Sequence, residues 1–117
     1  MLAHGAVLRS TLFSADEVEA IARDYRTAGL TPAEVAMMSL AQKVTLNAYQ
    51  VSAEDIEALR HHGFSDEEIL DIVLTAAARS FFSEVLDALG AEPNRVYSEL
   101  PPELREALAI GRPFPNS

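Results

Sequence analysis

The stretch SDEEILDIVLTAAARSFFSEVLDALG, residues 65–90, decides the fold. It begins with Ser65 and, three residues later, Glu68, which is the spacing of a capping box that satisfies the first N–H groups of a helix. It ends at Gly90, a residue type that ends helices in the left-handed conformation. The residues between these signals predict one helix over 66–89, about 36 Å long at the α-helical rise per residue.

This predicted helix is apolar on nearly every side between Ile69 and Ala78, and Phe81, Phe82 and Leu86 continue the pattern. A helix that is apolar all round must be buried all round. We therefore expect a long, buried central helix. Its cover is either the neighbouring helices of the same chain or a second subunit, and the second alternative predicts a homo-oligomer, a dimer or higher.

Three more segments carry the same pattern of helix-start residues as Ser65 and Glu68. Each has a hydroxyl at the N-cap, an acid three residues later, and an apolar residue before the cap that can staple onto one in the first turn. The starts are Ser14 with Glu17, Thr31 with Glu34, and Ser52 with Asp55; the four stapled pairs are Phe13 with Val18, Leu30 with Val35, Val51 with Ile56, and Phe64 with Ile69.

These signals predict an all-α fold, a compact bundle of about six helices, because no segment shows the two-residue alternation of a half-buried strand. A single domain is expected over residues 1–110, followed by an extended, proline-rich tail over 111–117. The expected helices run to about Leu12, then over 15–28, 32–47, 53–62, 66–89 and 102–109, with Gly29, Gly63 and Gly90 as stop signals.

Composition limits the function. The 117 residues include no cysteine, so the chain has no thiol nucleophile, disulfide or thiolate metal ligand of its own. The net charge of −9 disfavours nucleic acid and anionic membranes as partners, since both are negative. No apolar run approaches the roughly 20 residues of a membrane span, and Met1–Phe13 lacks a signal-peptide pattern. We therefore expect a soluble, cytoplasmic protein.

Few residues offer chemistry. His61 and His62 are adjacent, so they point about 100° apart on a helix, and their place in a last helical turn favours dipole complementation over a shared ligand set. Asp66, Glu67 and Glu68 complement the opposite helix end in the same way. Arg79 interrupts the apolar helix, which favours a structural ion pair over anion binding. No metal or cofactor is expected.

Several stretches together resemble the alkylhydroperoxidase D-like proteins of the carboxymuconolactone decarboxylase superfamily, in particular their peroxidase-related branch. The most specific is Gly63-Phe64-Ser65-Asp66-Glu67-Glu68-Ile69-Leu70, within a match over 58–78. The other stretches are residues 2–9, 24–30 and 41–45.

The resemblance implies a redox motif C-x-x-C-x-x-x-H on a helix, with an upstream glutamate, in which two cysteines reduce a peroxide and the histidine relays protons. The motif's histidine matches His4, which is therefore the one candidate catalytic residue of this chain. The two cysteines and the glutamate would fall before Met1, and we expect them to be encoded there. Without them a peroxide substrate has no thiolate to attack it.

Three functions follow from this interpretation. The first is a peroxidase-related antioxidant protein, inactive as this cysteine-free chain. The second is a non-catalytic, oligomeric helical scaffold on the same fold. The third is cysteine-free acid–base chemistry of the decarboxylase type, which would need His4 beside carboxylates in a closed pocket. An exposed His4 would favour the second.

Overall fold

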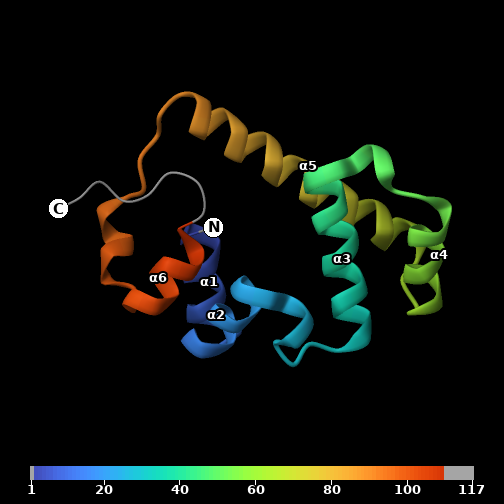
Figure 1. Ribbon diagram of the computed structural model, residues 1–117, viewed down its shortest axis with the longest axis horizontal. Helices are drawn as coiled ribbons and strands as arrows, with labels where there is room; N and C mark the ends of the chain where they lie inside the picture. The colour runs from blue at the N-terminus through green and yellow to red at the C-terminus, as the bar shows by residue number, and fades with distance from the viewer. Residues whose placement is uncertain (1, 110–117) are drawn as a thin grey trace. The chain divides into compact units, whose positions relative to one another are not determined.

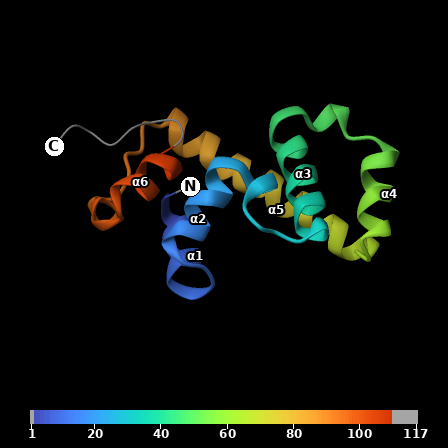
Figure 2. The same cartoon turned by 60° about the horizontal axis from the view of Figure 1, so that its bottom comes forward.

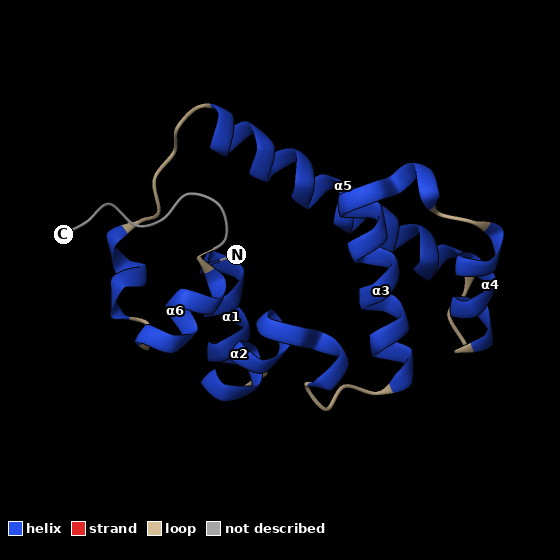
Figure 3. Ribbon diagram, viewed as in Figure 1, coloured by secondary structure: helices blue, strands red, loops and turns tan. Residues whose placement is uncertain are grey.

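Every element in the described part of the chain is a helix (Figures 1 and 3). The structure is a computed structural model that describes residues 2–109, with side chains from His4 onward. The expected tail over 111–117 lies outside the described residues. The α-helices are α1 (Leu2–Thr11), α2 (Ala15–Asp24), α3 (Pro32–Asn47), α4 (Ala53–His61), α5 (Asp66–Ala88) and α6 (Pro102–Leu108), joined by the 3₁₀ turns η1 (Tyr25–Thr27), η2 (Ala48–Gln50) and η3 (Arg95–Glu99).

All four predicted capping boxes are present. In each, the N-cap hydroxyl accepts a hydrogen bond from the N–H three residues on, and the acid there accepts one from the N-cap N–H. At the start of α5 both bonds, between Ser65 and Glu68, are 3.1 Å long. At the start of α4, Ser52 donates its N–H to Asp55 at 2.8 Å. The prediction of all-α structure with six α-helices is thereby confirmed for the described residues.

The predicted second helix over 15–28 was too long. The structure ends α2 at Asp24, and the 3₁₀ turn η1 follows. The reason is local, because the Asp24 carboxylate accepts a hydrogen bond from the Arg26 N–H and so starts a new turn. The predicted stops at Gly63 and Gly90 are confirmed, with φ of 91° and 74°. Gly29 also has a positive φ, 79°, but it follows η1 and does not end α2.

The chain divides into two compact units, each with its own buried cluster; the expectation of one domain stays a prediction. The first unit takes Met1–Gly29 and Asp87–Ser117. Its core consists of Val18 from α2, Leu100, and Leu104 and Leu108 from α6, with Phe13 packed against it. The staple expected between Phe13 and Val18 thus lies in this core.

The second unit is Leu30–Leu86 and contains α3, α4 and most of α5. Its core is Leu40, Leu59 and Ile69, one residue from each helix. Ala36 and Val44 lie one helical turn on either side of Leu40 and pack on the same cluster, as do Phe64 and the stapled pair Val51 and Ile56. Helices α3 and α4 lie side by side in this unit, as Figure 2 also shows.

The complete burial expected for α5 is not seen within the second unit. Ile69 and Ala76 are buried, but six large apolar side chains of this helix are between 39% and 61% exposed. The prediction assumed that neighbours of the same chain, or a second subunit, cover every side of α5. Within the second unit, α5 is covered on one side only.

Candidate interaction surface and charged clusters

His4, the predicted catalytic residue, lies in α1 with an exposed side chain. It belongs to the first unit, whereas His61, Glu67 and Arg79 belong to the second. An exposed histidine is what the non-catalytic interpretation expects, since acid–base chemistry on carbon needs a group shielded from water. The role of His4 stays a prediction.

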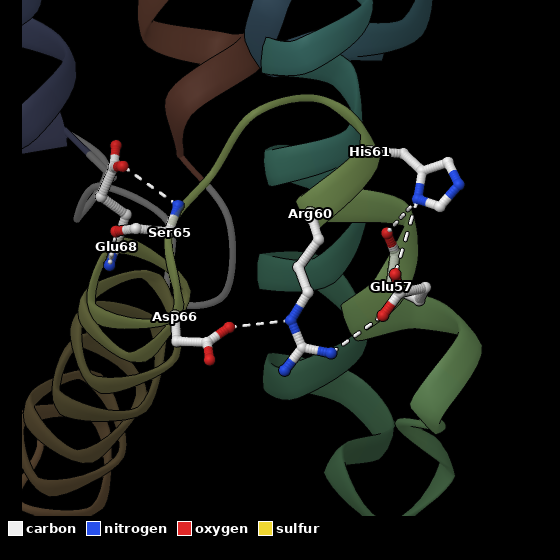
Figure 4. Close-up of polar contacts among 6 residues, drawn as sticks. All are labelled: Glu57, Arg60, His61, Ser65, Asp66 and Glu68. Carbon is white, nitrogen blue, oxygen red and sulfur yellow. Dashed lines mark hydrogen bonds and ion pairs between the residues drawn. The ribbon is translucent and has the colours of Figure 1, made fainter.

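A cluster of charged residues surrounds the turn from α4 to α5 (Figure 4). Arg60 donates from Nε to Asp66 at 2.8 Å and from a terminal nitrogen to Glu57 at 2.9 Å. These bonds, the one to Asp66 first, raise the pKa of the Arg60 guanidinium above its usual range. Figure 4 shows the guanidinium extended between the two acids, so Arg60 joins the end of one helix to the start of the next.

His61 belongs to the same cluster. Its Nδ1 lies 3.1 Å from the Glu57 carbonyl oxygen and 3.7 Å from the Glu57 carboxylate. The ring is therefore in the last turn of α4, whose final carbonyls accept hydrogen bonds from the N–H groups of His62, Gly63 and Phe64. This geometry agrees with the dipole complementation predicted for the histidine pair.

The acids of the cluster already have partners, because they accept hydrogen bonds from Arg60 or cap α5. All of the charged side chains in its ion pairs are more than 40% exposed. Exposed ion pairs contribute little to stability and leave a reacting group in water. We interpret the cluster as a structural one, whose ion pairs hold the turn between α4 and α5 in place.

Arg79 differs from its expectation. The half-buried guanidinium donates a hydrogen bond to the Ser83 hydroxyl, one turn further along α5. A hydroxyl oxygen, rather than the carboxylate of an ion pair, is thus the partner that the structure shows. The long aliphatic part of arginine can pack on apolar neighbours while its head reaches a polar atom, which explains why a charge is tolerated there.

An ion pair that sequence analysis missed joins α3 to α4. Lys43 Nζ lies 2.6 Å from Asp55, whose carboxylate also closes the Ser52 capping box; the side chains are 34% and 30% exposed. The hydrogen bond from Lys43, followed by that from the Ser52 N–H, lowers the pKa of Asp55. No sequence signal pairs residues 12 positions apart on separate helices, so only the packing of α3 on α4 reveals it.

The most extensive feature is apolar. Six exposed side chains on α5 form what we call the α5 face: Leu70, Leu74, Phe81, Phe82, Val85 and Leu86. Phe81 and Phe82 contact each other edge to face, with ring centroids 5.5 Å apart. Single exposed apolar residues are ordinary, but a large group of them on one element marks an interaction surface.

Other kinds of site are not found in the described part of the chain. Among residues 2–109 no three histidine or acidic side chains gather as metal ligands would. No described helix is long and apolar enough to cross a membrane.

Comparisons of the chain with protein-family models, curated proteins and solved structures find no match. The resemblance to alkylhydroperoxidase D-like proteins therefore stays a prediction, as does the cytoplasmic location.

Proposed function

We propose that this chain acts as a non-catalytic helical interaction protein that binds through the α5 face. The observation that carries the proposal is the exposure of six large apolar side chains on one helix. Covering such a surface is favourable by about 25 cal/mol for each Å² removed from water. An interaction partner would also complete the burial that the sequence of α5 predicts.

The charged residues support this interpretation. Several acids and bases of the second unit close capping boxes or form the Arg60 and Lys43 ion pairs. The exposed His4 offers no shielded base. A protein whose polar groups fasten helices while its largest apolar surface stays open is suited to association rather than to catalysis.

Sedimentation at micromolar concentration tests the proposal. We expect an assembly larger than the 12.7 kDa of one chain, and we expect Leu74→Glu to dissociate it by placing a charge on the α5 face. Leu46→Glu is the matched control, since Leu46 is a leucine of α3 that is 65% exposed and lies outside the α5 face. A stable monomer that also binds no apolar dye at α5 would refute the proposal.

A second proposal is descent from the peroxidase-related branch of the alkylhydroperoxidase D-like proteins. Its most specific stretch, 63–70, forms a defined structural element here: a left-handed Gly63, a complete Ser65–Glu68 box and the buried Ile69. The proposal concerns ancestry and not activity, because the chain has no cysteine. Peroxide turnover by the purified chain is the corresponding test.

A further inference from the structure

We propose that α5 pairs with α5 of a second copy of this chain, antiparallel, about a two-fold axis that passes between Ala77 and Ala78. This inference rests on the proposed function and names the partner that the α5 face binds. It follows from the order of residues along the exposed side of the helix.

Part of the α5 face lies in a narrow stripe. At 100° per residue, one set of positions between residues 70 and 85 gathers on one side of α5, opposite the buried Ile69 and Ala76. Glu67 and Ala88 lie on the same side, beyond the two ends of this set. All members of this set are exposed. We call it the α5 stripe; it consists of Leu70, Leu74, Ala77, Ala78, Phe81 and Val85.

The large residues of the α5 stripe are spaced symmetrically about its midpoint. Leu70 and Val85 lie equally far from the midpoint between Ala77 and Ala78, and so do Leu74 and Phe81. In an antiparallel pair centred on that midpoint, each large residue lies at the same height along the helix axis as a large residue of the partner. The same patch then serves both copies, which is the requirement of a two-fold interface.

The sizes of the residues also support a two-fold axis between Ala77 and Ala78. Alanines at the midpoint allow the two helix backbones to approach to about 8 Å, while the larger side chains on either side fill the space as the helices diverge. Leu74 and Phe81 are 55% and 61% exposed, so both can lose apolar area to a partner. A small residue between two large ones is therefore placed where a helix crossing needs it.

The exposed area is of the right order for a pair of this kind. A large apolar residue presents roughly 150–200 Å² when fully accessible, so the exposed fractions of Leu70, Leu74, Phe81, Val85 and the adjacent Phe82 amount to roughly 400–550 Å². The two alanines bring this close to the roughly 600 Å² per partner at the lower end of stable interfaces.

Charge is less unfavourable in the antiparallel direction. The first turn of α5 carries Asp66, Glu67 and Glu68. A parallel pair would bring two such turns together, and their like charges would repel. An antiparallel pair separates them by nearly the length of α5, about 33 Å, which exceeds the screening length of about 8 Å at physiological salt. Each first turn then comes level with residues 87–89 of the partner, which include one acid, Asp87, and Asp71 comes level with Glu84.

Disulfide cross-linking tests the geometry, because the chain has no cysteine and any introduced thiol is unique. Under mild oxidation we expect Ala77→Cys and Ala78→Cys each to form a covalent dimer with itself, since both lie beside the axis. Leu70→Cys should not link to itself, because its two copies would be about 22 Å apart along the helices. A mixture of Leu70→Cys with Val85→Cys should give the mixed dimer.

The matched control is Thr75→Cys, an exposed position outside the α5 stripe, which should stay monomeric on a non-reducing gel. Self-linking of Leu70→Cys, or equal linking of Thr75→Cys, would overturn the antiparallel pairing even if sedimentation shows a dimer. A monomer in sedimentation with no cross-link at any position would overturn both this inference and the proposed function. Circular dichroism on each variant shows whether the helical content of the chain is retained.

Discussion

Gly5 of α1 lies directly against Leu108 of α6. A Cβ added at Gly5 would stand 2.4 Å from one terminal methyl of Leu108 and 2.9 Å from the other. Gly5 is buried and Leu108 is only 3% exposed, so the leucine has little room to move. The glycine therefore permits the close contact of two helices in the first unit.

We expect Gly5→Ala to destabilise the first unit although alanine favours helix. The propensity gain is about 0.5–1 kcal/mol, whereas overpacking typically costs about 1–3 kcal/mol. Urea unfolding should show a lower midpoint for this variant. In Gly5→Ala/Leu108→Ala the new methyl occupies space that the leucine vacates, so the double variant should lose less than the sum of the single losses. Simple additivity would show that the two residues do not touch.

The core of the second unit predicts a cavity effect. Leu59 is 2% exposed and packs with Leu40 and Ile69. Leu59→Ala should lower the free energy of unfolding by about 2–5 kcal/mol. Leu46→Ala in α3 removes the same atoms from a residue that is 65% exposed, so it should change stability by less than about 0.5 kcal/mol. Equal effects of the two variants would contradict the placement of this core.

Acid should loosen the helix starts. Hydrogen bonds from their N-cap residues lower the pKa of Glu17 and Glu34 from an ordinary 4.5, and Lys43 with Ser52 lowers that of Asp55 from 3.8. A carboxylate with a lowered folded-state pKa stabilises the fold fully above its unfolded pKa, and this stability is lost as pH falls through the folded value. The urea midpoint should therefore fall as pH drops below about 4.5.

The variant Glu34→Gln separates the loss of stability caused by protonation of a capping carboxylate from other effects of acid on the fold. The amide keeps a hydrogen-bond acceptor for Thr31 but no longer titrates, so the variant should lose less stability between neutral and acid pH than the parent chain. Glu67→Gln is the control, because Glu67 is in the first turn of α5 without being part of its capping box. An identical pH dependence in all three proteins would rule out the capping carboxylates as its source.

The purified chain should consume hydroperoxide no faster than buffer in the presence of a dithiol reductant. The reason is chemical, since peroxide reduction of this kind needs a thiolate and the chain has no cysteine. His4→Ala should leave the background rate unchanged. Turnover that resists thiol-blocking reagents and metal chelation but disappears in His4→Ala would instead support cysteine-free acid–base chemistry.

The sequence by itself determined the helices. Capping boxes such as Ser65 with Glu68, and stops such as Gly63, are interactions within a few residues, so their partners can be read from spacing alone. The bounds of α3 were predicted as found, and the error in α2 arose from another local bond, that of Asp24 with Arg26. The same local order places Leu74 and Phe81 symmetrically about two alanines.

Only the tertiary structure decided which helices meet. The pairing of Lys43 with Asp55 and the contact of Gly5 with Leu108 join residues from separate helices, and no local spacing encodes such a contact. The open side of α5 is likewise a tertiary fact. A helix that is apolar on every side is expected to be covered by other parts of the protein. Because apolar burial is non-directional, the sequence of the helix does not determine which element covers it. Within the second unit α3 and α4 cover the side of Ile69, and the side of Leu74 and Phe81 stays exposed.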